Sequence, residues 1–83
     1  MENRLGFVGI IIENRKQSAQ DVNKVLSDFG DAIVARMGLP YSKKNVSVIT
    51  LVVDTSTDAL SAITGKLGVI KGVSVKSALS KIT

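Results

Sequence analysis

The chain has 83 residues, with 11 lysines and arginines against 7 aspartates and glutamates, and neither cysteine nor histidine. The two missing residue types exclude disulfides, thiolate chemistry, imidazole bases and zinc sites built from nitrogen and sulfur ligands. A hydrophobic content of 45% excludes disorder, and the length predicts one domain over residues 1–83. No apolar run has the length of a membrane span or a signal peptide, so we expect a cytoplasmic protein.

The first strand is predicted over Arg4–Glu13, where both alternating sets of side chains are apolar. A strand of this kind needs cover on both faces and is typical of the centre of a sheet. Residues 14–17 follow as a polar connector.

A helix is predicted over Ala19–Phe29, because apolar residues recur there at the spacing of one helical face. Ser18 and Asp21 have the spacing of a capping box at its start. Gly30 stands where a left-handed residue would end the helix.

The next segment, Asp31–Leu39, could continue the helix on propensity alone, but Gly30 and Pro40 bracket it at the length of a strand. We therefore predict a strand, followed by a loop over residues 40–44 that closes a hairpin. The strand Asn45–Thr55 comes after the loop and is apolar in both of its side-chain sets, which indicates a second central strand.

A second helix begins with Thr55 and Asp58 as a capping box and ends at Gly68. Its apolar stripe consists of Ala59, Leu60, Ile63 and Leu67. Residues 69–72 turn the chain into a last strand, Val73–Ile82, in which apolar and polar side chains alternate.

The order β-α-β-β-α-β predicts an α+β ferredoxin-like sandwich, with a four-stranded antiparallel sheet and both helices on one face. The first and third strands lie at its centre. Because both are apolar on both faces, the face without helices must carry apolar side chains, whichever set that is. Such a surface predicts self-association into a dimer or a larger oligomer through the sheet.

The acidic residues have no spacing that requires acid–base catalysis, and no nucleophile has a base in reach without histidine, so we do not expect an enzyme. RNA recognition on this topology needs aromatic side chains on the central strands. The first strand has only Phe7 and the third has none, so we do not expect nucleic acid as a partner. Arg36 is a charge inside a predicted strand, expected at an edge with its guanidinium in water; the alternative is an interface ion pair or an anion ligand.

A set of short segments spans nearly the whole chain and resembles the iron-only hydrogenase system regulator family. The segments are Gly9–Arg15, Ser18, Val22-Asn23, Leu26, Gly30-Asp31, Arg36–Tyr41, Gly65–Gly68 and Gly72–Lys76. That family is similar to ACT-type regulatory domains and to the C-terminal domain of the nickel-responsive repressor. The resemblance implies a small regulatory, effector-binding or assembly module that pairs through its sheet. Metal sensing does not carry over, because the repressor's histidine and cysteine ligands have no counterpart here.

Effectors of ACT domains lie near the loop between the first strand and the first helix, which implies a site at residues 14–18, with the loop 38–44 beside it. The candidate ligand-binding residues are Asn14, Arg15, Ser18, Arg36, Tyr41 and Lys43. Side chains with amide and basic groups suit a small anion or carboxylate. The alternative is that these are ordinary solvated loops of a protein that only assembles. We expect no metal and no cofactor.

Overall fold

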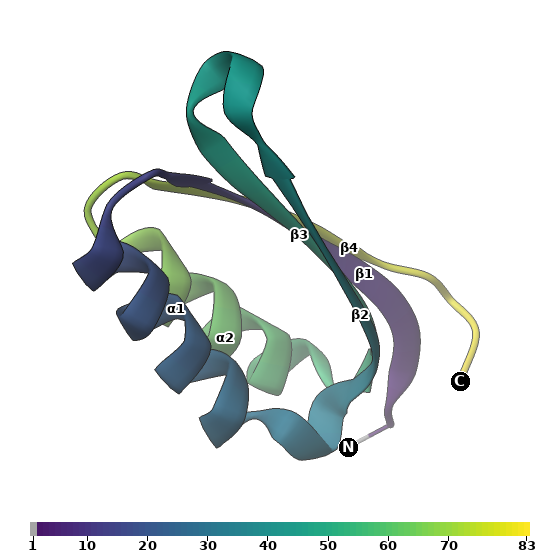
Figure 1. Ribbon diagram of the computed structural model, residues 1–83. Coiled ribbons are helices and arrows are strands. Elements are labelled where there is room, and N and C mark those ends of the chain that lie inside the picture. Colours follow the sequence, from purple (N-terminus) through teal and green to yellow (C-terminus); the bar gives the residue numbers. More distant parts are fainter. Residues whose placement is uncertain (1) are drawn as a thin grey trace.

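A computed structural model of the chain describes residues 2–83 (Figure 1). Its strands are β1 (Arg4–Glu13), β2 (Ile33–Tyr41), β3 (Val46–Thr55) and β4 (Val73–Leu79), and its helices are α1 (Lys16–Asp28) and α2 (Thr57–Gly68). Short 3-10 turns, Gly30–Ala32 and Ser42–Lys44, stand on either side of β2. The predicted order of elements is confirmed.

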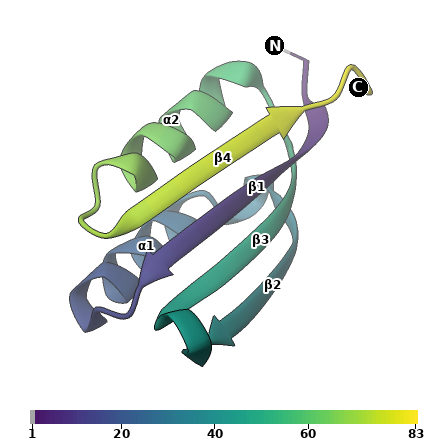
Figure 2. The same ribbon diagram turned by 90° about the horizontal axis from the view of Figure 1, so that it is seen from above.

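The four strands form one antiparallel sheet in the order β2-β3-β1-β4, with β1 and β3 at the centre as predicted. Both helices lie on one face of it, and the β2–β3 hairpin rises beyond them (Figure 1). Figure 2 shows α1 and α2 behind the sheet, with β2 running along the edge outside the helices. The fold is the predicted ferredoxin-like α+β sandwich.

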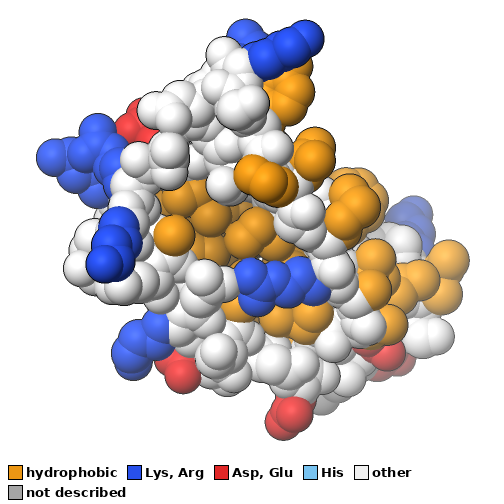
Figure 3. Space-filling model, in the orientation of Figure 1, with side chains coloured by type: hydrophobic (Ala, Val, Ile, Leu, Met, Phe, Trp, Pro, Cys, Tyr) orange, Lys and Arg blue, Asp and Glu red, His pale blue; other side chains and the backbone are white. Residues whose placement is uncertain are grey.

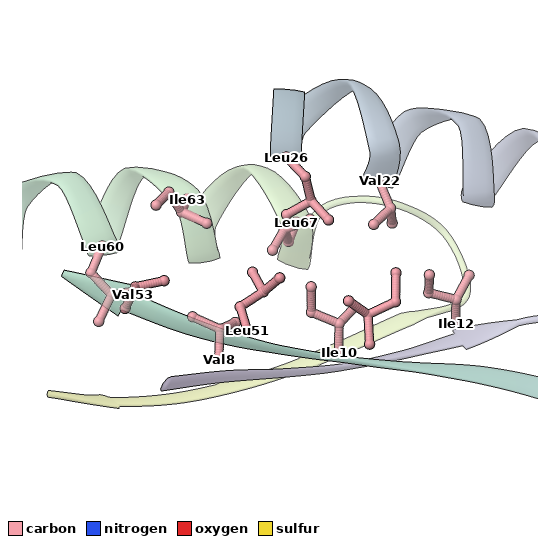
Figure 4. Close-up of a cluster of buried hydrophobic side chains, with 11 residues drawn as sticks. Val8, Ile10, Ile12, Val22, Leu26, Leu51, Val53, Leu60, Ile63 and Leu67 are labelled. Atoms are coloured by element: carbon pink, nitrogen blue, oxygen red, sulfur yellow. The ribbon is translucent and has the colours of Figure 1, made fainter. Parts of the chain in front are cut away.

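The core lies between the helices and one parity of the two central strands. It consists of Val8, Ile10, Ile12, Ile49, Leu51 and Val53 of the sheet with Val22, Leu26, Leu60, Ile63 and Leu67 of the helices. Figure 4 shows side chains of the two layers pointing toward one another. Each such side chain contributes about 1.5–3 kcal/mol when it leaves water, so the apolar stripes of the helices determine which parity is inward.

The first helix begins earlier than its predicted capping box. Arg15 is the N-cap residue and its side chain makes no capping hydrogen bond. Ser18 is buried in the first turn of α1, where its Oγ donates to the Lys71 carbonyl oxygen at 2.6 Å. Asp21 accepts from Gln17 Nε2 at 2.9 Å instead of completing a cap. The predicted role of Ser18 and Asp21 is therefore wrong: both are on the helix, and Ser18 ties it to the turn before β4.

The predicted helix ends also need correction. Ser56, not Thr55, caps α2, because its Oγ accepts from the Ala59 amide at 3.1 Å. Thr55 is the last residue of β3 and is buried. Gly30 opens a 3-10 turn without a positive φ; among the described residues the left-handed positions are Asn45 and Gly72.

Strand β2 is confirmed as a strand, but it includes Pro40 and Tyr41, which were expected in the loop. Proline is tolerated because β2 is an edge strand. In a regular strand Ile33 and Ala35 would lie on the same face of the sheet. A register shift between them puts them on opposite faces. The last strand, β4, ends at Leu79 rather than Ile82.

Candidate functional site

The sheet surface opposite the helices is apolar and accessible in the isolated chain. We call it the open face; its large apolar members are Leu5, Phe7 and Ile11 of β1, Val48 and Val52 of β3, and Met37, Leu39 and Tyr41 of β2. Phe7 is 59% exposed, Met37 63% and Leu39 51%. Figure 3 shows hydrophobic side chains gathered on the side of the molecule beyond the sheet, away from the helices. The predicted apolar character of this face is confirmed.

The two loops predicted to form a site do meet. Asn14, just after β1, donates from its backbone amide to the Asn45 carbonyl oxygen at 3.1 Å and from Nδ2 to Asn45 Oδ1 at 2.9 Å. Asn45 ends the 3-10 turn of the hairpin with a φ of 55°, a left-handed conformation that asparagine adopts more readily than most residues. We call this place the loop junction.

A cavity of about 480 Å³ opens at the loop junction. Its lining consists of Glu13, Asn14, Arg15, Lys44, Asn45 and Val46. Arg15 Nε donates to Glu13 Oε2 at 3.0 Å, and both side chains are about half exposed (48% and 57%). Gly72 packs behind this pair, since a Cβ there would lie 3.0 Å from Glu13 Oε2 and 3.3 Å from Arg15 Nε. Two cations against one carboxylate give the cavity a positive balance, which suits an anion.

Four of the six predicted site residues lie at or beside the junction. Asn14 and Arg15 line its cavity, and Tyr41 lines a neighbouring hollow of about 160 Å³ that shares Asn14 and Asn45. Lys43 is in the same 3-10 turn as Lys44 but lines neither space.

Ser18 and Arg36 do not belong to the junction. Ser18 is buried in α1, as described above. Arg36 lies on the helix side of edge strand β2, where its Nη2 donates to Asn23 Oδ1 of α1 at 2.6 Å. Its expected edge position is confirmed, and its place on the helix side of β2 separates it from the loop junction.

Sequence reasoning missed Glu13, Asn45 and Val46, which were assigned to strands; Lys44 was inside the predicted loop 38–44, although Lys43 was named as the candidate. One signal was present: an asparagine after a polar run is a frequent left-handed turn residue, and Asn45 follows Lys43-Lys44.

A second, apolar cavity of about 340 Å³ lies at the opposite end of the sheet. It is lined by Leu5, Gly6, Phe7, Val52, Ala78, Leu79, Ser80 and Ile82. The segment after β4 forms one side of it and is held to β1 by two backbone hydrogen bonds. The Leu5 amide donates to the Ile82 carbonyl oxygen at 3.0 Å, and the Ser80 amide donates to the Leu5 carbonyl oxygen at 2.8 Å. We call it the apolar cavity.

The described part of the chain, residues 2–83, contains no group of three acidic, histidine or cysteine side chains placed to hold a metal ion. Over the same residues, neither helix has the length and apolar character required to cross a membrane.

Comparisons with known proteins agree with this fold. An uncharacterised protein of Thermotoga maritima, TM1266, has a solved structure that superposes with a TM-score of 0.94 at 38% identity, over 96% of this chain and 100% of the other. The ACT domain of the GTP pyrophosphokinase of Chlorobium tepidum superposes at 0.73 and 22% identity, over 92% and 99%. A protein of unknown function from Galdieria sulphuraria gives 0.64 and 13%, over 99% of this chain and 47% of the other, so the latter two show the fold alone.

No curated protein matches the chain. A family model does, over residues 4–77, and its description is "TM1266-like: Iron-only hydrogenase system regulator, putative". The match covers most of the sheet and both helices, and the 38% identity to the Thermotoga protein extends over the whole domain. The chain therefore belongs to the TM1266-like family of iron-only hydrogenase system regulators, with an ACT-like fold.

Proposed function

We propose that the chain is a non-catalytic regulatory module that binds a small carboxylate or another small anion in the cavity at the loop junction. The observation that carries this proposal is the meeting of two cationic side chains, Arg15 and Lys44, beside the amide pair Asn14–Asn45. These groups come from loops far apart in the sequence. An anion held between them would stabilise their association and so alter the hairpin that carries part of the open face.

The geometry favours an anion with more than one oxygen. The Nε of Arg15 is bound to Glu13, while its Nη atoms have no hydrogen bond among the described residues and are available as donors. A guanidinium offers parallel donors to a carboxylate, and an ammonium adds a point charge. The Glu13 carboxylate repels a second negative group placed beside it, so a compact monoanion or a dianion with separated charges fits best.

Thermal unfolding with defined probes tests this proposal. Acetate, amino acids, dicarboxylates, citrate and nucleotides are added one at a time, and the melting temperature is followed. A probe at about 100 times its Kd adds about 2.7 kcal/mol to the free energy of unfolding, which raises Tm by about 10 °C or more for a domain of this size.

Arg15→Ala and Lys44→Ala should each reduce the Tm shift. Lys43→Ala is the matched control, because Lys43 has the same charge and lies in the same turn but outside the cavity. A probe that stabilises all variants equally places the binding site elsewhere. If no probe raises Tm, the effector proposal fails.

The open face favours a second candidate function, a protein that acts through assembly alone. A contiguous apolar surface on one side of a small sheet usually marks a protein interface. On this alternative the loop junction is only a structural contact. Substitution of its residues then changes the stability of the chain, and no probe shifts Tm. The same probe series, read together with the oligomeric state, separates the two.

A further inference from the structure

We propose that the end of the molecule around the loop junction docks on duplex DNA without reading its sequence, with the tip of the β2–β3 hairpin in the major groove. This inference goes beyond the small-anion effector and does not require one. It follows from the distribution of charge along the length of the molecule and from the shape of the hairpin.

Positive charge is concentrated at one end of the molecule, which we call the basic end. The end of β1, the start of α1, the tip of the hairpin and the turn before β4 come together there (Figure 2). Hydrogen bonds join these segments, since Asn14 binds Asn45 and Ser18 binds the Lys71 carbonyl oxygen. The cationic residues of the basic end, all of them exposed, are Arg15, Lys16, Lys43, Lys44 and Lys71.

Negative charge is concentrated at the opposite end. The end of α1, the end of β3 and the start of α2 lie there, next to the two chain termini (Figure 2). The exposed acidic residues of this end are Glu2, Asp28, Asp31, Asp54 and Asp58, with Arg4 and Lys81 as the cations beside them. The basic end sets five cations against the carboxylate of Glu13, so it alone carries as much positive charge as the net +4 of the whole chain. Such a separation of charge turns the basic end toward an anionic surface.

The lysines of the basic end are free to bind phosphates. Among residues 2–83 the one ion pair joins Arg15 to Glu13, so the ammonium groups of the four lysines face water. These lysines come from three separate segments and are spread over the whole end of the molecule. A small anion can use only part of this set, whereas a chain of phosphates can contact all of it.

The hairpin tip suits the major groove of B-form DNA. It projects beyond the helices (Figure 1) and is two strands wide, and paired strands lie about 4.8 Å apart. The major groove is about 12 Å wide and admits a two-stranded β-ribbon. Figure 3 shows Lys and Arg side chains at the hairpin tip and again on the flank below it. With the tip in the groove, the cations at the start of α1 and in the turn before β4 face the phosphates beside it.

The composition of the basic end favours DNA over a protein partner. Protein interfaces have an apolar, aromatic-rich centre, whereas protein–DNA interfaces are more polar and strongly positive. Residues 42–45 at the tip are a serine, two lysines and an asparagine, which can donate hydrogen bonds to phosphates but have no apolar group to fill a protein pocket. The sequence-based expectation against nucleic acid concerned bases stacked on the sheet, and phosphate contacts require no aromatic residue.

The salt dependence of DNA binding tests the inference. Fluorescence anisotropy follows a labelled duplex of mixed sequence, about 16 base pairs long, from 50 to 200 mM NaCl. Each lysine that neutralises a phosphate contributes about −0.9 to the slope of log K against log salt concentration. Four lysines predict a slope of about −3.6, so binding should weaken by about 150-fold over this range. A second duplex of unrelated sequence should bind with the same Kd.

The triple variant Lys16→Gln, Lys43→Gln and Lys71→Gln removes three charges from the basic end. We expect a slope of about −0.9 and at least about a 30-fold loss of affinity at 50 mM NaCl. All three positions are exposed, and circular dichroism checks the fold. Should the triple variant fail to fold, each single variant must still reduce the slope by about 0.9.

A second triple variant, Lys24→Gln, Lys66→Gln and Lys81→Gln, changes the net charge by the same amount outside the basic end. Lys24 is within α1 and Lys81 follows β4. The Lys66 side chain turns away from the basic end, because its Nζ lies 6.0 Å from the ring centroid of Phe29, at the other end of α1. This variant should keep the native slope. Equal losses in the two triple variants overturn the inference, since they would reflect net charge alone.

Other polyanions test the groove and the choice of partner. Duplex RNA of the same length should bind at least about 5-fold more weakly, because its major groove is deep and too narrow for a ribbon. Val69 is 85% exposed in the turn before β4, so phosphatidylserine vesicles are included as a competitor. Equal affinity for the two duplexes overturns the placement of the hairpin in the major groove. Vesicles that compete as well as DNA at equal anion concentration would instead assign the basic end to a membrane surface.

Absence of binding at 200 µM protein and 50 mM NaCl also overturns the inference. Lys16, Lys43 and Lys71 lie outside the lining of the loop-junction cavity. The first triple variant should therefore keep any Tm shift that a small anion produces, which distinguishes failure here from failure of the effector proposal.

Discussion

Asn14 and Asn45 join the end of β1 to the tip of the β2–β3 hairpin through two hydrogen bonds, one between backbones at 3.1 Å and one between side chains at 2.9 Å. The two residues are 31 positions apart in the sequence, and the backbone of Asn45 has the left-handed conformation. Asn45 therefore has two separable roles, as a turn residue and as a hydrogen-bond acceptor.

Substitution of Asn45 separates these roles. Asn45→Ala should lower the free energy of unfolding by about 2 kcal/mol, roughly half from left-handed strain and half from the lost side-chain bond. Asn45→Gly loses the bond but not the conformation and should lower it by about 1 kcal/mol. Urea denaturation measures both. Equal values for the two variants would show that the left-handed backbone carries no strain for alanine here.

Gly6 is required by the close approach of β1 and β4. A Cβ at this position overlaps the Ala78 carbonyl oxygen and lies 2.6 Å from Leu79 Cδ2. Gly6→Ala should destabilise the fold by about 2–3 kcal/mol through overpacking, measured by urea denaturation. Gly38→Ala on β2 is the matched control, since nothing lies within 4 Å of its Cβ position. Similar losses for the two variants would contradict this explanation.

The Ser56 cap supports the start of α2. Ser56→Ala removes the acceptor for the Ala59 amide and should lower the free energy of unfolding by about 1 kcal/mol. Ser56→Asp keeps an acceptor and adds a negative charge at the positive end of the helix, so it should preserve stability. Thermal unfolding of the native chain, Ser56→Ala and Ser56→Asp ranks their stabilities. A loss of stability in Ser56→Asp as large as in Ser56→Ala would mean that the serine does not act as a cap.

Ser18 connects α1 to the turn before β4, 53 residues later. Ser18→Ala should cost about 1 kcal/mol, the typical net value of one hydrogen bond. Gln20→Ala, at an exposed position of the same helix, should leave stability unchanged or raise it slightly through helix propensity. Hydrogen exchange should show the local effect at the first turn of α1. Unchanged protection there in Ser18→Ala would contradict the role of this bond.

The order of elements was predictable from the sequence because apolar residues recur with clear periods. The central position of β1 and β3 followed from two apolar sets on each strand. Which set faces the helices did not follow, since both sets satisfy the same pattern and only the packing of the helix stripes distinguishes them. Only the structure therefore showed that the side-chain set with Phe7 lies on the face without helices.

The wrong predictions for single residues each depend on one local feature of the backbone. Ser18 and Ser56 are both serines near the start of a helix, and spacing alone does not show which one is the cap. The side of the sheet on which Arg36 lies depends on the irregularity between Ile33 and Ala35, which reverses the alternation of β2. The candidate site was placed at residues 14–18 through the resemblance to ACT domains. That Lys44 and not Lys43 lines the cavity depends on the geometry of one 3-10 turn.

The position of β1 has a consequence for synthesis. This strand is made first, yet its two neighbours are β3 and β4, and β4 is the last element of the chain. Until the ribosome has completed residue 55, β1 has neither of its hydrogen-bonding partners, and until it has completed residue 79 the edge of β1 that pairs with β4 stays open. Unpaired apolar strands are the segments from which nascent chains aggregate. A truncation before Val73 would make this exposure permanent along one side of β1, so even a short C-terminal deletion should send the product into inclusion bodies or to a chaperone.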